Sequence, residues 1–121
     1  MVATQLSGSL IVRDKNLLMI YNEESDQWNV PNGRGRRGEL SADTAERIAE
    51  EHTGCSSDAT RYMSNLKTSF EAEGEEITWQ PYMVEIEGEP EKAEWVNLGE
   101  INSDQVAEPL QSIFEKLKNK L

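Results

Sequence analysis

The stretch "WNVPNGRGRRGELSADTAERIAEEHTG", residues 28–54, decides the fold of this chain. It opens as a loop rich in glycine and arginine and continues as a segment with helical spacing. Ser41 is a residue type that caps helices, Asp43 suits the dipole of a first turn, and Gly54 is well placed to end the helix. One helical face collects small and apolar residues, namely Ala42, Ala45, Ile48 and Ala49. The stretch therefore predicts a loop followed by an amphipathic helix.

The segments before this loop predict strands. Residues 5–13 end in a β-branched apolar run, and residues 17–21 form a second one. The tripeptide "DKN" between them suits a tight turn, so the two runs predict a hairpin. Residues 27–30 predict a short strand that Pro31 stops.

The segments after the helix predict more strands and a second helix. Residues 60–71 and 77–86 are expected to be strands joined by a turn at Gly74, with Pro81 marking an edge or a bulge. Residues 93–98 predict another strand or strand end. A closing helix is expected from near Pro109, because apolar residues follow helical spacing at Val106, Leu110, Ile113, Leu117 and Leu121. The order of elements favours one α+β domain over residues 1–121.

Composition limits the classes of function. The 121 residues include 12 Lys and Arg against 23 Asp and Glu, which gives a net charge of −11. Such a surface repels nucleic acid and anionic membranes, so neither is an expected partner. The single cysteine, Cys55, excludes an intrachain disulfide. With no apolar run of membrane-spanning length and no signal peptide, we expect a cytoplasmic protein.

The loop carries a local reversal of charge. Arg34, Arg36 and Arg37 stand between glycines at 33, 35 and 38 in an otherwise acidic chain. Guanidinium groups match phosphate oxygens, and glycines let a ligand approach the backbone, so the loop can bind an anion. A solvated loop whose arginines pair with the protein's own acids explains the same residues equally well.

The helix taken alone suggests no special chemistry. Arg47 and Glu51 are four residues apart and can form an ion pair, as alternating charges do on many solvated helices. Glu39 stands just before the helix, where a carboxylate can reach its N-terminus. Glu46 and Glu50 share another face.

Loop and helix together resemble the Nudix box, G-x5-E-x7-R-E-U-x-E-E-x-G-U with U apolar. The matching residues are Gly33, Glu39, Arg47, Glu51 and Gly54. Trp28 and Pro31 stand where many Nudix proteins have an aromatic residue and a proline, and the flanking hairpin, strands and closing helix agree over nearly the whole chain. The resemblance to this MutT-like superfamily implies an α/β/α sandwich with a mixed β-sheet, in which Arg47 and Gly54 are structural.

The chain departs from this pattern at the residues that hold metal. Nudix hydrolases cleave nucleoside diphosphates linked to another group, and three glutamates of the box helix hold Mg²⁺ against the diphosphate. Those positions are Ile48, Glu51 and His52 here, so a single carboxylate remains. Ile48 offers Mg²⁺ no ligand and extends the apolar face, and Glu50 points elsewhere. His52 suits softer divalent ions or a base titrating near neutrality, although an imidazole at a helix end explains it without function.

The resemblance and its departures leave three hypotheses. The first is a domain that binds a nucleoside-diphosphate derivative or another phosphorylated small molecule through Gly33 and the loop arginines, with weak or lost hydrolysis. An aromatic ring such as Trp28, Trp79 or Tyr82 could stack on a base, although packing in the core or on a strand explains each ring more simply. The second is an active hydrolase using Mg²⁺ or Mn²⁺, with Glu51 as the chief ligand and catalytic residue. The third is an interaction module without a small ligand.

Further expectations follow from the resemblance. In the hydrolase hypothesis, Glu39 or an acid from segment 71–94 supports the metal, and His52 is a second candidate for catalysis. Homodimers are common in the family, so a homodimer is a possible assembly.

Overall fold

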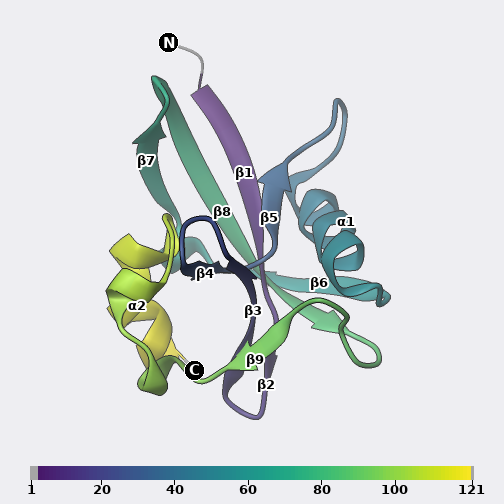
Figure 1. The fold of residues 1–121 in the computed structure, drawn as a ribbon. Helices are drawn as coiled ribbons and strands as arrows, with labels where there is room; N and C mark the ends of the chain where they lie inside the picture. The colour runs from purple at the N-terminus through teal and green to yellow at the C-terminus, as the bar shows by residue number, and fades with distance from the viewer. Residues whose placement is uncertain (1–2, 121) are drawn as a thin grey trace.

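Two β-sheets form the centre of the protein in the computed structural model, which describes residues 3–120. The larger sheet has the order β5-β1-β8-β6, with β7 also paired to β8, and the smaller has the order β2-β3-β4, with β9 paired to β3 (Figure 1). Their strands are β1 (Ala3–Leu10), β2 (Val12–Arg13), β3 (Asn16–Asn22), β4 (Gln27–Asn29), β5 (Asn32–Arg34), β6 (Ser57–Tyr62), β7 (Thr68–Ala72), β8 (Glu75–Ile86) and β9 (Glu94–Val96).

The larger sheet is mixed, as the sequence predicted. Strand β1 runs parallel to β8 with Gly8 opposite Pro81, whereas β5, β6 and β7 pair antiparallel with their neighbours. A parallel pair needs a long connection, and here strands β2 to β7 and α1 (Ser41–Thr53) all lie between β1 and β8 in the sequence.

The two helices lie far apart on the two sides of the molecule (Figure 1). Helix α1 packs against β1, β6 and β8, and α2 (Leu110–Lys120) packs near the short 3-10 turns Ser64–Leu66 and Ser103–Gln105. The buried apolar residues accordingly form two clusters. The larger includes Trp79 and the inner face of α2, and the smaller includes Ala45 and Ala49 of α1. Each helix therefore owes its position to one apolar face.

Several local predictions are confirmed. The expected hairpin is formed by β2 and β3, and its turn residues Asp14 and Lys15 have φ of 55° and 68°. Gly54 ends α1 with φ 72° in the left-handed region. Leu110, Ile113 and Leu117 are buried on α2; Val106 is buried too but precedes the helix, and Leu121 lies outside the described residues.

Other local predictions are wrong. Ser41 does not cap α1: the N-cap is Leu40, without a side-chain cap, and the Ser41 hydroxyl bonds the Tyr82 hydroxyl at 2.6 Å. The strand expected over 60–71 is interrupted by the 3-10 turn at Ser64–Leu66. Of the two alternatives for Pro81, the edge is wrong, because β8 is central. The pairing of β8 with β6 is irregular nearby, between Ala59 and Arg61, and Pro81 lies opposite the interruption, where its carbonyl accepts from the Met63 N–H at 2.9 Å.

The loop after Pro31 also contains more structure than expected. Its first residues form strand β5, which pairs with β1 and brings Gly33 opposite Ser7. Elsewhere, within residues 3–120, no helix combines the length and the apolar character that a membrane crossing requires.

Gly8 has the tightest packing of the glycines in the structure. A Cβ built there would overlap the Nε1 and Cζ2 atoms of Trp79, whose side chain is fully buried. We predict that Gly8→Ala lowers the free energy of unfolding by about 1–3 kcal/mol, because the indole ring must move in a dense core. Urea unfolding of the purified variant measures this change.

A double-mutant cycle tests whether the clash is the cause. In a Trp79→Phe background, the smaller ring lacks the atoms nearest to Gly8, so Gly8→Ala is expected to cost less there than in the parent. Equal costs in both backgrounds would show that the destabilisation has another origin.

Candidate functional site

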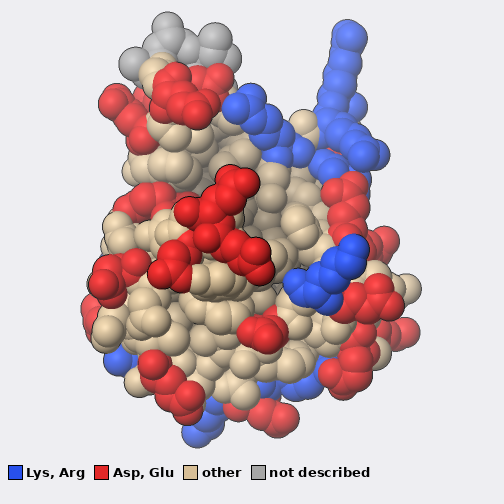
Figure 2. Space-filling view, in the orientation of Figure 1, with Lys and Arg blue, Asp and Glu red and all other residues tan. Residues whose placement is uncertain are grey.

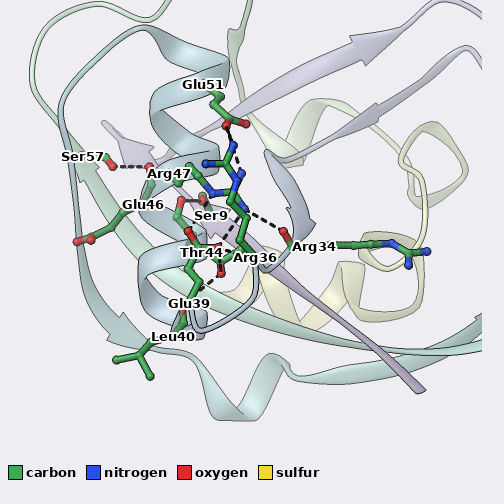
Figure 3. A network of polar contacts seen from close by, with 11 residues as sticks. Ser9, Arg34, Arg36, Glu39, Leu40, Thr44, Glu46, Arg47, Glu51 and Ser57 are labelled. Atoms are coloured by element: carbon green, nitrogen blue, oxygen red, sulfur yellow. Dashed lines mark hydrogen bonds and ion pairs between the residues drawn. The ribbon is translucent and has the colours of Figure 1, made fainter. Parts of the chain in front are cut away.

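The guanidinium group of Arg47, a residue of α1, joins this helix to the loop between β5 and α1 (Figure 3). Its Nε donates to Oε2 of Glu39 at 2.9 Å, and its Nη2 donates to Oε1 of Glu39 at 3.1 Å and to the carbonyl of Arg34 at 2.9 Å. Its Nη1 donates to Glu51 at 3.2 Å, so the predicted i,i+4 ion pair is present. A bidentate guanidinium–carboxylate contact fixes direction as well as distance. The shape of the loop therefore depends on one side chain of α1.

Glu39 is fully engaged as a hydrogen-bond acceptor. Besides Arg47, it accepts from the backbone N–H of Arg36 at 2.9 Å and from the hydroxyl of Thr44 at 2.7 Å. The bond from Arg47, followed by those from Arg36 and Thr44, lowers the pKa of the Glu39 carboxyl from 4.5 to about 2. Glu39 in turn raises the pKa of the Arg47 guanidinium further above its usual range. The pair is thus charged at any ordinary pH.

Glu51, the one carboxylate at the three positions where the resemblance to the Nudix box places metal ligands, faces two guanidinium groups. Its Oε1 lies 3.2 Å from Nη1 of Arg47 and 3.5 Å from Nη2 of Arg36. About half of the Glu51 side chain is exposed, and 69% of Arg36 is exposed. The carboxylate is therefore already balanced by the protein's own cations, in a position that solvent reaches.

Ile48 belongs to the packed interior rather than to the site. It is 3% exposed, and its Cδ1 lies 3.0 Å from the position that a Cβ on Gly33 would take. The absence of a side chain at Gly33 lets β5 lie against this isoleucine. Ile48 is therefore part of the apolar face of α1, as expected from the sequence.

Glu46 and Glu50 point to the other side of α1, as helical geometry predicted for Glu50. Glu50 accepts from the Ser57 N–H at 3.1 Å, and Glu46 accepts from the Ala59 N–H at 2.7 Å. Both carboxylates thus tie α1 to β6 and are not available as replacement ligands.

These residues do not fit the Mg²⁺ ion that the fold family implies. Mg²⁺ takes oxygen ligands in an octahedral arrangement, but Ile48 supplies none, Glu39 is saturated, and Glu51 is paired with arginines. His52 is exposed at the helix end. Among the described residues, no three His, Cys, Asp or Glu side chains are grouped so that they could hold a metal ion.

The loop arginines extend outward from this network. Arg34 pairs with Glu75 at 3.0 Å and is 64% exposed, and Arg36 pairs with Glu51 as described. Arg37 is exposed and has no ion pair with any residue in the part of the chain that the structure describes. Figure 2 shows these basic side chains gathered over the β5–α1 loop, next to a hollow in the middle of the same face. Two of the loop arginines therefore pair with the protein's own acids and remain exposed to solvent. Binding of an anion by the loop stays a prediction.

A cleft of about 570 Å³ opens between β3, β4 and β9. Its lining includes Met19, Tyr21, Glu23, Trp28, Lys92 and Glu94. Lys92 follows Glu91, whose N–H donates to the carbonyl of Thr53 at 3.0 Å, so one wall adjoins the end of α1 that carries Glu51 and His52. The cleft thus lies near the C-terminal end of α1.

The three aromatic residues considered for stacking on a base lie in different surroundings. Trp28 lines the cleft together with Tyr21, and their rings meet edge-on with centroids 5.1 Å apart. Trp79 is fully buried in the core, so the suggestion that it stacks on a ligand is wrong. Tyr82 is half-buried against Tyr62. Tyr21 was missed because its place at the end of an apolar run resembles ordinary strand packing.

Solved structures with the same arrangement are Nudix proteins. The MutT Nudix hydrolase of Burkholderia pseudomallei matches with a TM-score of 0.81 at 21% identity, covering 97% of this chain and 99% of that one. The Ap4A hydrolase of C. elegans matches with a TM-score of 0.74 at 14% identity, covering 98% of both. A UDP-X diphosphatase matches with a TM-score of 0.74 at 13% identity over 99% of this chain, which spans 64% of its length.

The likeness is one of fold. The chain has the α+β Nudix fold with a mixed sheet and two helices, and it matches Nudix hydrolases over its whole length. Neither a protein-family model nor a curated protein matches the sequence.

The depressed pKa of Glu39 predicts how stability depends on pH. A carboxyl whose folded-state pKa lies below its unfolded value stabilises the fold above that value and loses this contribution as pH falls. We predict that Glu39→Gln melts at a lower temperature than the parent at pH 7, and that this difference shrinks as pH falls from 4.5 to about 2. Thermal denaturation followed by circular dichroism over this pH range measures it.

The matched control is Glu115→Gln on α2. Glu115 is exposed and has no hydrogen bond or ion pair among residues 3–120, so this variant is expected to melt like the parent throughout. A Glu39→Gln difference that stays constant down to pH 2 would contradict the role of the ionised carboxylate.

Proposed function

We propose that the chain is a single Nudix domain that binds a nucleoside-diphosphate-linked or other phosphorylated small molecule, with weak or lost hydrolysis. Two observations carry this proposal: exposed arginines leave a fixed loop, and one of them, Arg36, reaches Glu51 near the end of α1 that a cleft adjoins. The phosphates would meet Arg34, Arg36 and Arg37, and the attached group would enter the cleft.

The fixed backbone of the loop supports this role. Arg47 and Glu39 hold the carbonyl of Arg34 and the N–H of Arg36, so the arginine side chains leave from an ordered backbone. A preorganised loop loses less conformational entropy when a ligand binds. We therefore propose that Glu39 and Arg47 position the loop, and that Glu39 does not hold the supporting metal that the sequence suggested. Gly33 contributes by leaving room for Ile48 under β5.

The cleft supports a ligand with an aromatic group. Tyr21 and Trp28 offer apolar ring surface, while Lys92 and two glutamates, Glu23 and Glu94, offer polar contacts. Ligand sites commonly combine apolar walls with a few polar groups in this way. A nucleoside attached to a diphosphate would place its base against the rings and its phosphates toward the basic loop.

An active hydrolase is the alternative. Its support is that Glu51 is half exposed and that Glu94, of the nine glutamates in segment 71–94, lines the cleft. To bind metal there, Glu51 would have to release Arg36 and share the ion with a second carboxylate. Turnover of ADP-ribose or a nucleotide sugar with Mg²⁺ or Mn²⁺, abolished by Glu51→Gln, would establish this alternative and contradict the proposal.

Arginine variants test the binding site directly. We predict that ADP-ribose, nucleotide sugars, dinucleotides or nucleoside triphosphates include at least one ligand that raises the melting temperature of the parent protein. The variant with Arg34 and Arg37 both changed to Gln should bind this ligand at least roughly 10–100-fold more weakly, because losing even one well-formed charged hydrogen bond costs about 1.5–3 kcal/mol. Isothermal titration calorimetry gives both dissociation constants.

The matched control is the double variant Lys116→Gln with Lys118→Gln. It removes the same charge from exposed positions on α2, away from the cleft, and is expected to bind like the parent. A parent protein that responds to none of these phosphorylated compounds would sink the proposal.

Restoring the missing carboxylates tests the placement of the box. We predict that Ile48→Glu with His52→Glu binds Mn²⁺ measurably more tightly than the parent, because two oxygen ligands are added beside Glu51. The electron paramagnetic resonance signal of free Mn²⁺ reports the bound fraction. Ile48 is buried, so the variant should also unfold more easily by about 1.5–3 kcal/mol from lost apolar burial. A folded double variant with the metal affinity of the parent would contradict the alignment of residues 33–54 with the box.

A further inference from the structure

We infer that guanidinium groups take the place of the divalent cation in this site, so that it binds a diphosphate-containing ligand without metal. This inference rests on the proposed function, since it concerns how the same site holds its ligand. Its starting point is that Ile48, Glu51 and His52 do not suit the Mg²⁺ ion that the fold family implies.

The first observation is the balance of charge around the loop. The loop–helix cluster comprises Arg34, Arg36, Arg37, Arg47, Glu39, Glu51 and Glu75, which are joined by ion pairs or adjacent in the loop. Four cations against three anions leave one net positive charge, in a chain whose net charge is −11. Glutamates at positions 48 and 52 would instead leave one net negative charge. A cluster of that sign needs an added cation before it can attract a phosphate, whereas this cluster does not.

The second observation is where the guanidinium groups lie. Arg36 and Arg47 approach the same oxygen of Glu51, at 3.5 Å and 3.2 Å. A divalent ion that used this oxygen would have to displace both arginines and would then meet their repulsion at close range. Arg36 and Arg47 therefore supply the positive charge that balances the Glu51 carboxylate.

The two arginines differ in how firmly they are held. Arg47 is 21% exposed and is bound by Glu39 and by the Arg34 carbonyl as well as by Glu51. Arg36 is 69% exposed, and its side chain makes one long ion pair. Exposed pairs of this kind contribute little to stability, so a phosphate can draw Arg36 away from Glu51 at low cost. Arg47 would then continue to neutralise Glu51 while Arg36 contacts the ligand.

The chemistry of the guanidinium group sets the class of ligand. Its planar donors match two oxygens of a phosphate, and several such groups on one loop match a chain of phosphates better than a single carboxylate. The predicted ligand is therefore a diphosphate or a diphosphate ester, recognised as the free anion rather than as its magnesium complex.

Calorimetry with and without metal tests the inference on the full chain. The probes are ADP-ribose and inorganic pyrophosphate, titrated into protein treated with excess EDTA and, separately, into protein in excess Mg²⁺. We expect at least one probe to bind in EDTA, with a dissociation constant no more than about threefold weaker than in Mg²⁺. Binding that occurs only after Mg²⁺ is added would overturn the inference but leave the proposed binding function standing. Failure to bind in either condition would overturn both.

A single variant tests the part played by Arg36. In EDTA, Arg36→Gln is expected to weaken binding of the same probe roughly tenfold. The control, Arg61→Gln, makes the same charge change at an exposed position on β6 whose surroundings include Leu66 and Leu117, and should bind within about twofold of the parent. Circular dichroism melting confirms that both variants are folded. An Arg36→Gln protein that binds in EDTA as tightly as the control would overturn the assignment of Arg36.

Discussion

The fixed geometry of this site depends on one side chain, Arg47. Its guanidinium group binds the carboxylate of Glu39 through two nitrogens, the backbone of the loop through Arg34, and the next turn of its own helix through Glu51. Because Glu39 also accepts from the Arg36 N–H and the Thr44 hydroxyl, loop and helix behave as one unit. The arginines that face solvent are thereby presented from a backbone that the protein itself holds in place.

The same arrangement is compatible with a Nudix fold whose positions 48 and 52 carry no carboxylate. Arg47, Glu39 and Gly33 perform structural work, since they shape the loop and let β5 lie over Ile48. At positions 48 and 52, Ile48 belongs to the apolar interior and His52 is an exposed imidazole. A fold constrains the frame of a site more than its charge. In the proposal made above, that charge selects guanidinium groups rather than a metal ion as the partners of the anion.

Sequence reasoning succeeded where local chemistry decides the structure. Helical spacing and Gly54 located α1, the i,i+4 spacing located the Arg47–Glu51 pair, and the two apolar runs with "DKN" between them located a hairpin. It failed where distant segments decide. The strand expected over 60–71 breaks opposite Pro81 of β8, whose nitrogen carries no hydrogen to donate to the ladder. Ser41 bonds Tyr82 from β8 instead of capping its helix. The cleft escaped prediction for the same reason, since Tyr21, Trp28 and Lys92 come from three separate segments. No residue pattern signalled that Arg36 would reach Glu51.

The central claim is that arginine side chains, rather than a divalent ion, balance Glu51 in the presence of ligand. Anomalous diffraction at the manganese edge, from crystals grown with excess Mn²⁺ and ADP-ribose, observes this directly. The account predicts no anomalous peak at Glu51 and a phosphate oxygen within hydrogen-bonding distance of the Arg36 guanidinium. A manganese ion coordinated by Glu51 and bridging to the diphosphate, with Arg36 turned away, would contradict it.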